Sequence, residues 1–202
     1  MQTIDQKTFA IDVGKINDSY FLNIACIGID AEVAGNVDVM KKWGIPKAWL
    51  YNASILYTFF RYKFKKIKVE YNNLKKEESY TIFTICNANY YGNGFLVAPN
   101  AKLDDGLFDL CYADRLSKIK IPRLLLKSRK GKHITSKYVH TERADQVRIN
   151  ADQEIMCNMD GETVIAREFQ IELIKSGITI FNDLEFIEEI LKKTNTYDIN
   201  KV

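Results

Sequence analysis

Residues 86–111 have the sequence CNANYYGNGFLVAPNAKLDDGLFDLC, and the rest of the chain is best understood from this stretch outward. An alternating run over 80–85 precedes it and an apolar run over 107–112 ends it, which predicts a strand on each side. Between them lie glycines, asparagines, a proline and the acidic group Asp104-Asp105-Gly106, all of which favour turns. The sequence therefore predicts a long ordered loop with carboxylates, a common location for function.

Short apolar runs outside this loop predict further strands, because they alternate or end at turn residues. They lie at 9–13, 20–26, 67–71, 146–150, 154–158, 169–174 and 178–181. A polar turn is expected over 72–79, and hairpin turns at 151–153 and at Ser176-Gly177. Many short strands without a βαβ rhythm favour a mainly β (β-rich α+β) fold over a doubly wound one. We expect an antiparallel β-sandwich or curled sheet with two or three appended helices.

Three segments have apolar residues at helical spacing. The first begins at Pro46, and its spacing of three and four residues predicts one packed face, made of Ala48, Tyr51, Ile55, Phe59 and Tyr62. The second covers 119–127 and ends at Gly131, and the third covers 183–193 behind an N-cap at Asp183. We expect one domain over 1–182, followed by a C-terminal helix and tail over 183–202.

Basic residues gather near the first two of these helices. Arg61, Lys63, Lys65 and Lys66 follow the first one, where positive charge suits the helix dipole. Within 118–132, one side of the helix is basic and the other apolar. Such a helix can lie on an anionic membrane surface, although a solvated basic face over a packed apolar one is the commoner case. The net charge of +3 gives no argument for nucleic acid as a partner.

The four cysteines are isolated from one another in apolar surroundings and form no CxxC pair; they are Cys26, Cys86, Cys111 and Cys157. Because no secretory signal begins at Met1, buried reduced thiols in a cytoplasmic protein are expected. The apolar run 48–60 is shorter than the roughly 20 residues that a spanning helix needs. Polar residues also interrupt this run, so it predicts a packed helix.

Phosphate-binding loops are missing from the sequence. Gly92-Asn93-Gly94 lacks the third glycine of the dinucleotide fingerprint, and Gly131-Lys132 lacks the upstream glycine and the following Ser or Thr of a P-loop. These residues therefore predict no nucleotide site.

Two acidic turns are better candidates for chemistry. Asp104, Asp105 and Asp109 offer the hard oxygen ligands that magnesium or calcium prefers. The structural alternative is a tight turn whose carboxylates accept backbone N–H bonds. Glu162, next to Asp160-Gly161, could act as a general base toward a substrate hydroxyl, although such a turn by itself is more often a plain surface turn.

Five motifs also occur in the order found in a known family. They are NIACIGIDA at 23–31, NANYYG at 87–92, APNAKLDDGLFD at 98–109, Gly131-Lys132-His133 and Asp160-Gly161-Glu162. Together they resemble the C-terminal domain of bacterial diacylglycerol kinase-like lipid kinases, with sphingosine kinases as more distant relatives. The resemblance covers the chain from about Phe9 to Phe181.

This resemblance implies a cytoplasmic enzyme, peripheral to the membrane, that transfers the γ-phosphate of ATP to the hydroxyl of a diacylglycerol-like lipid. It implies two domains, of which this chain looks like the second alone, inactive without the ATP-binding domain. Glu162 corresponds to the proton acceptor, with Asp160 beside it orienting the site or helping with metal. Asp105, with the main-chain carbonyls of Lys102 and Leu107, corresponds to a structural Mg²⁺ site.

Two hypotheses stay open at this point. The chain is either the lipid-binding, base-supplying half of such a kinase, or a non-catalytic lipid-binding or interaction module with the same fold. The sequence departs from the family's glycine-rich pattern at Tyr90, Tyr91 and Asn93, so it does not define which lipid is bound. It also leaves the oligomeric state open, with a homodimer among the options.

Overall fold

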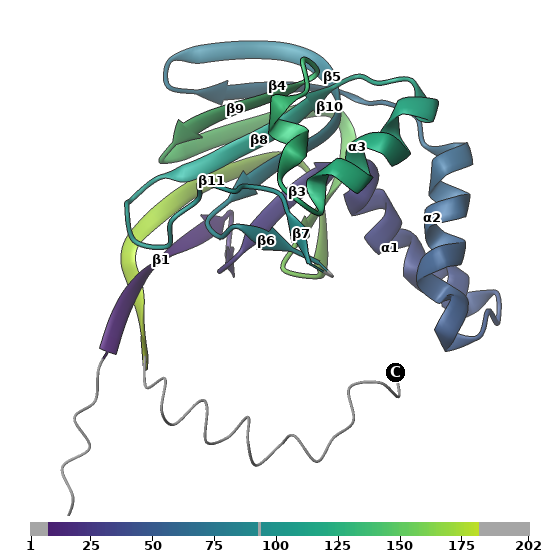
Figure 1. The fold of residues 1–202 in the computed structure, drawn as a ribbon, viewed down its shortest axis with the longest axis horizontal. Helices are drawn as coiled ribbons and strands as arrows, with labels where there is room; N and C mark the ends of the chain where they lie inside the picture. Colours follow the sequence, from purple (N-terminus) through teal and green to yellow (C-terminus); the bar gives the residue numbers. More distant parts are fainter. Residues whose placement is uncertain (1–7, 93, 182–202) are drawn as a thin grey trace, which may run out of the picture.

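The structure is a computed structural model that describes residues 8–92 and 94–181. It is mainly β, as predicted, and three α-helices lie outside the sheet in the described part of the chain (Figure 1). The main sheet contains β1 (Thr8–Ile16), β2 (Ser19–Phe21), β3 (Ile24–Gly28), β4 (Lys66–Tyr71), β5 (Leu74–Cys86), β8 (Phe108–Asp114), β9 (Val139–Ala144), β10 (Gln146–Met159) and β11 (Glu162–Phe181). A small second sheet pairs β6 (Tyr90–Tyr91) with β7 (Phe95–Leu96). The α-helices are α1 (Ile29–Lys42), α2 (Leu50–Arg61) and α3 (Ile121–Ser128), and short 3₁₀ turns are η1 (Lys47–Trp49), η2 (Lys118–Lys120) and η3 (Lys132–Thr135).

Every pair of neighbouring strands in the main sheet is antiparallel, in the order β2-β1-β11-β10-β3-β5-β8-β9. β4 also pairs with both β10 and β5. Since β3 pairs with the same two strands at other residues, β3 and β4 share one position in the sheet at different heights.

The sheet curls over on itself, which closes the core. The rings of Phe21 in β2 and Phe108 in β8 stack with their centroids 5.6 Å apart, although these strands lie near opposite ends of the strand order. Fully buried side chains of the central strands, including Phe83 and Phe169, fill the same core. The predicted sandwich is confirmed, and it is built from one folded sheet.

Two predicted hairpins are wrong, because each pair of predicted strands is one long strand. β10 runs through 151–153, where its register against β11 shifts between Asn150 and Ile155. β11 likewise runs through Ser176, which has φ 50°, opposite a register shift in β1 between Ile11 and Val13. The turn-forming residues mark bulges, which let the long strands bend with the curled sheet.

The polar turn expected over 72–79 is shorter than predicted. Only Asn72 and Asn73, with φ of 47° and 62°, form the connection, and β5 begins at Leu74. Two left-handed residues match the twist of a hairpin, and asparagine tolerates this conformation. The charged residues 75–78 belong to the strand, where they are largely exposed.

Helix α1 was missed by the sequence interpretation. Its sequence, IDAEVAGNVDVMKK, contains Gly35, Asn36 and several valines, which are weak helix formers. Tertiary packing compensates, since Ala31, Val33 and Met40 are buried and the helix lies against α2.

Helix α2 exists where it was predicted, but its buried face is different. Leu50, Ser54 and Thr58 are buried, whereas Tyr51 and Ile55 of the predicted face are exposed. The two buried hydroxyls have partners in α1: Ser54 Oγ donates to the Val33 carbonyl at 2.5 Å, and Thr58 Oγ1 accepts from Asn36 Nδ2 at 2.9 Å. Hydrogen bonding to α1 thus fixes the orientation of α2, which apolar spacing alone does not reveal.

All four cysteines are buried and free, as expected. None of the helices within residues 8–92 and 94–181 combines the length and the apolar character needed to cross a membrane. The predicted helix at 183–193 lies outside the described residues, so the expected division at residue 182 stays a prediction.

Candidate functional site

Both acidic turns lie at the same end of the sheet. Met159, the last residue of β10, pairs with Ala25 of β3, and Ile24 pairs with Cys86 at the end of β5. Cys86 in turn pairs with Asp109 of β8. The turn at Asp160 and the loop at Asp105 are therefore about three strand spacings apart, roughly 14 Å. At that separation they cannot share one metal ion, but they can serve one bound molecule or one interface.

The first turn joins β10 to β11 through two residues. Asp160 has φ 48° and Gly161 has φ 103°, while Met159 and Glu162 pair across the turn. A two-residue connection with both residues in the left-handed region strongly favours Asp-Gly. The hairpin fixes Glu162 as the first residue of a twenty-residue strand.

The carboxylate of Asp160 is engaged by the backbone of the segment between β2 and β3. It accepts the N–H groups of Leu22 at 2.6 Å, Asn23 at 3.1 Å and Ile24 at 2.9 Å. The predicted single strand over 20–26 is broken here into β2 and β3. The structure thus gives Asp160 a structural role, while a role in orienting the site or in holding metal stays a prediction.

Glu162 is exposed and has no hydrogen-bond or salt-bridge partner in the described part of the chain. Its backbone, by contrast, is held by the hairpin on one side and by the Asp160 bonds on the other. A carboxylate on a fixed backbone with open oxygens can accept a proton from an incoming hydroxyl. The geometry is compatible with the general-base role that the resemblance implies.

Behind this turn lies a buried polar cluster that the sequence analysis did not single out. Asn158 Oδ1 accepts the Tyr91 hydroxyl at 2.8 Å and the Gly161 N–H at 3.2 Å, and its Nδ2 is buried without a partner in the described residues. Burial raises the pKa of Asp30, and hydrogen bonds from Tyr91 and Cys26 offset part of this rise. An acid directly after the buried strand β3 was the signal available in the sequence.

The loop at Asp105 is arranged differently. Asp105 Oδ2 forms an ion pair with Arg143 of β9, and its Oδ1 accepts the Leu107 N–H at 3.3 Å. Arg143 Nε lies 3.6 Å from Asp109 Oδ2. Burial raises the pKa of Asp109, and Arg143 offsets part of that rise. Arg143, which the sequence analysis did not consider, is thus shared between the two carboxylates.

A buried carboxylate on β1 anchors the same loop. Asp12 accepts the Gly106 N–H at 2.7 Å and the Ser176 N–H at 2.8 Å. The side chains of Asn87 and Asn89 donate to backbone carbonyls across the loop, among them those of Asp12 and Ala98. An acid between two apolar residues of one strand, Ile11 and Val13, was the missed signal for Asp12. These bonds make the loop a rigid part of the fold.

The fit of magnesium at Asp105 is limited by Arg143. One carboxylate and the carbonyls of Lys102 and Leu107 are hard oxygen donors of the kind Mg²⁺ prefers. Arg143 already occupies Asp105 Oδ2, and the described residues contain no cluster of three or more metal-binding side chains. The donors suit the ion chemically, provided that Arg143 moves off the carboxylate.

Surface grooves do not single out the Glu162 turn. An open groove of about 560 Å³ is lined by Lys102, Asp105, Asp109 and Arg143, among others. A larger one, about 860 Å³, lies beside the β4–β5 hairpin and includes none of the predicted site residues. The case for Glu162 as a site residue therefore rests on the geometry of its turn and on the residues around it.

Comparison with known proteins gives the same family as the motifs. Residues 23–181 match the YegS C-terminal NAD kinase beta sandwich-like domain. The chain is 27% identical over 159 residues to the diacylglycerol kinase of Staphylococcus haemolyticus, covering 79% of this chain and 48% of that protein. It is 25% identical over 154 residues to the diacylglycerol kinase of Bacillus subtilis, covering 75% and 50%. The chain thus spans about half the length of these relatives.

A solved structure agrees on the fold. The crystal structure of a diacylglycerol kinase from Bacillus anthracis str. Sterne superposes with a TM-score of 0.59 at 20% identity, over 88% of this chain and 55% of that one.

Proposed function

The chain belongs to the YegS C-terminal NAD kinase beta sandwich-like domain family, and we propose from this premise that it is the substrate-side domain of an ATP-dependent lipid kinase. The reaction is transfer of the γ-phosphate of ATP to the hydroxyl of a diacylglycerol-like lipid. The names of the two curated relatives support the reaction class.

The observation that carries this proposal is the Asp160–Glu162 turn. Its backbone is fixed by the hydrogen bonds of Asp160 to residues 22–24 and by that of Asn158 to Gly161, yet the carboxylate of Glu162 stays exposed. Phosphoryl transfer depends mainly on positioning and charge neutralisation. Glu162 accepts the proton of the lipid hydroxyl as that oxygen attacks the γ-phosphorus. The bond between the γ-phosphorus and the oxygen that bridges it to the β-phosphate breaks, and ADP leaves with the electron pair of that bond.

The sequence of these 202 residues contains no phosphate-binding loop. In this proposal, ATP is bound by a nucleotide domain outside them. We expect the chain by itself to transfer no phosphate. Magnesium bound with ATP neutralises phosphate charge. A second ion at Asp105, with the carbonyls of Lys102 and Leu107, would be structural and would hold the loop next to β9.

The test is a phosphorylation assay with labelled ATP, magnesium and diacylglycerol in mixed micelles. The chain is assayed alone and together with the ATP-binding domain of a related kinase, each as wild type and as Glu162→Gln. Glu168→Gln is the matched control, since Glu168 is another exposed carboxylate on β11.

We expect activity only in the complemented sample, and we expect Glu162→Gln to lower it by about 10²-fold or more while Glu168→Gln leaves it unchanged. Equal activity of Glu162→Gln and wild type would overturn the base assignment. A folded chain that binds lipid but gives no activity with any ATP-binding domain would favour the non-catalytic lipid-binding module instead.

A further inference from the structure

Helix α2 buries polar side chains and exposes apolar ones, which is the reverse of a normal surface helix. Its polar residues Ser54 and Thr58 are buried against α1, while Leu56 is 60% and Phe60 70% exposed. Surface helices of soluble domains place such side chains toward the core. A helix whose apolar side faces outward indicates that another apolar phase covers it.

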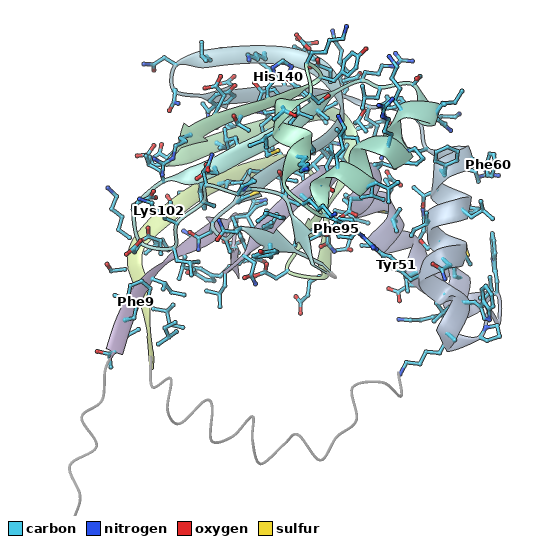
Figure 2. All side chains as sticks on the ribbon, in the orientation of Figure 1. Phe9, Tyr51, Phe60, Phe95, Lys102 and His140 are labelled. Carbon is cyan, nitrogen blue, oxygen red and sulfur yellow. The ribbon has the colours of Figure 1, made fainter. Side chains whose placement is uncertain are left out.

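The same side of the molecule carries further large apolar side chains. Trp43 and Trp49, in the connection from α1 to α2, are 60% and 65% exposed, and Ile119 and Leu126, in η2 and α3, are 89% and 69% exposed. Figure 1 shows α2 and α3 on one side of the sheet, and Figure 2 shows Phe60 projecting outward from α2.

Two contacts join these segments. Lys118 Nζ, at the start of η2, donates to the Phe60 carbonyl at 2.8 Å. The Arg115 guanidinium lies over the Phe64 ring at 5.2 Å from its centroid. The end of α2 and the start of the η2–α3 segment are therefore neighbours, and their exposed apolar side chains belong to one surface.

The charge of the chain is concentrated in the same two segments. Residues 39–69 and 115–141 contain no aspartate or glutamate, yet they hold 17 of the 29 lysines and arginines. Their net charge is +17 and that of the remaining residues is −14, against +3 for the whole chain. The small overall charge therefore conceals a strongly basic part.

The cations of the second segment are not neutralised within the described structure. No lysine or arginine of 115–141 forms a salt bridge to a residue in 8–92 or 94–181. Lys120 contacts the Tyr138 hydroxyl at 2.9 Å instead, and Arg129 lies over the Phe95 ring. In 39–69, by contrast, several lysines pair with acids nearby, such as Lys65 with Glu32. The free positive charge is therefore greatest around α3.

We propose that this surface, formed by α2 with the connection before it and by η2 and α3, docks on an anionic lipid bilayer. Bulky apolar and aromatic side chains enter the interfacial region, and the cations around α3 contact lipid head groups. Charge of one sign around projecting aromatic residues fits a lipid surface, which is uniformly anionic and laterally adaptable. A protein partner would need acidic groups placed to match.

The location suits a domain that acts on lipids, although the proposal does not depend on catalysis. Helix α2 packs against α1, and Asp30 lies in the first turn of α1. Asp30 contacts Tyr91, whose hydroxyl bonds Asn158 behind the Glu162 turn. A bilayer on α2 would therefore lie next to the site.

The chain supplies its own reporter, because its two tryptophans, Trp43 and Trp49, both lie on this surface. The experiment titrates the full chain with vesicles of phosphatidylcholine alone and of phosphatidylcholine with phosphatidylglycerol. We expect a blue shift of tryptophan emission with the anionic vesicles, quenching by brominated acyl chains, and loss of binding at high salt. Trp43→Phe and Trp49→Phe assign the signal to each ring.

Two double variants separate the apolar from the charged contribution. Leu56→Ser with Phe60→Ser, and Lys127→Glu with Lys130→Glu, are each expected to weaken binding to anionic vesicles by at least about tenfold. All four side chains are exposed, so the fold is retained. The matched controls are Leu74→Ser and Arg167→Glu, exposed residues outside both segments, which we expect to bind as wild type.

Three results would overturn the proposal. One is binding to neither vesicle type by folded protein, and another is vesicle binding without any change in tryptophan emission. The third is a blue shift that depends on protein concentration without lipid, because it would assign the surface to a second copy of the chain. Since no ATP is present in these experiments, failure of the kinase proposal leaves their outcome unaffected.

Discussion

The turn at Asp160–Glu162 and the loop at Asp104–Asp109 contain the same residue types at the same end of the sheet, but their carboxylates have different partners. In the loop, Asp105 and Asp109 share the single cation Arg143, and the buried Asp12 holds the backbone. In the turn, Asp160 bonds only backbone N–H groups, and Glu162 beside it stays exposed.

This difference shows what distinguishes a structural carboxylate from one available for chemistry. Carboxylates held by a cation or by several backbone N–H groups stabilise the fold, and those contacts compete with a substrate for their oxygens. Glu162 has a fixed backbone and open oxygens, which is the combination that proton transfer needs. Removing each carboxylate in turn tests this difference.

The largest effect is expected at Asp12. Asp12→Ala leaves the N–H groups of Gly106 and Ser176 without their acceptor inside the fold, which costs about 4 kcal/mol of unfolding free energy. Urea denaturation followed by circular dichroism measures it. Asp12→Asn keeps one acceptor oxygen and should lose about half as much. A loss below 1 kcal/mol in Asp12→Ala would show that the loop does not depend on this anchor.

A smaller loss is expected at Asp160. Asp160→Ala removes the acceptor of three backbone N–H groups and places alanine at φ 48°, at a cost of about 2 kcal/mol because the site is exposed to water. Asp160→Asn, which tolerates the same φ, is the control and should cost about 1 kcal/mol. Hydrogen exchange of the Leu22 and Ile24 amides reports the broken bonds directly. Unchanged exchange would refute the capping role.

The sequence was sufficient for the fold class and for the Asp-Gly turns, because both depend on local signals. Alternation predicts strands, and Asp-Gly at 160–161 predicts a turn. The same local signals misled at 151–153 and at Ser176, where turn residues form bulges inside long strands. A bulge and a hairpin differ in the partner strand, which local sequence does not encode.

The sites were predictable only in part, for a similar reason. The candidate residues came from turns and from the family resemblance, and their partners came from elsewhere in the chain. Arg143 is 38 residues from Asp105, and Asp160 bonds residues nearly 140 positions away. Likewise, the exposed face of α2 follows from the hydrogen bonds that Ser54 and Thr58 each form with helix α1. The periodicity of the sequence does not reveal these bonds.

A third prediction concerns Arg143. Arg143→Met removes the cation shared by Asp105 and Asp109. The pairs are partly exposed, so we expect a loss of only about 1 kcal/mol in urea denaturation near pH 7. Arg148→Met, on strand β10, is the matched control and should change stability little. If magnesium binds at Asp105, it should raise the melting temperature more in Arg143→Met than in wild type, since the competing cation is gone.

A pH dependence follows from the same pair. Burial raises the pKa of Asp109 above its ordinary value, and Arg143 offsets part of that rise. The Asp109 carboxyl therefore contributes most to folding stability below its unfolded pKa of about 3.9, and this contribution is lost as pH rises through its folded pKa. In Arg143→Met the folded pKa is higher still, and the loss extends to higher pH. The stability gap between wild type and variant should therefore be smaller at pH 4 than at pH 7. An equal gap at both values would mean that Arg143 does not act on Asp109.

The smallest effect on the fold is expected at Glu162. Glu162→Gln should change the unfolding free energy by less than about 0.5 kcal/mol, because the side chain is exposed and bonds nothing in the described residues. Its effect on phosphate transfer should instead be the largest of all, which is the opposite of what we expect at Asp12. Urea denaturation and the complemented kinase assay, done on the same preparations, make this contrast measurable. A variant that loses stability and activity together would show that Glu162 supports the turn as Asp160 does, and the distinction between the two carboxylates would then fail.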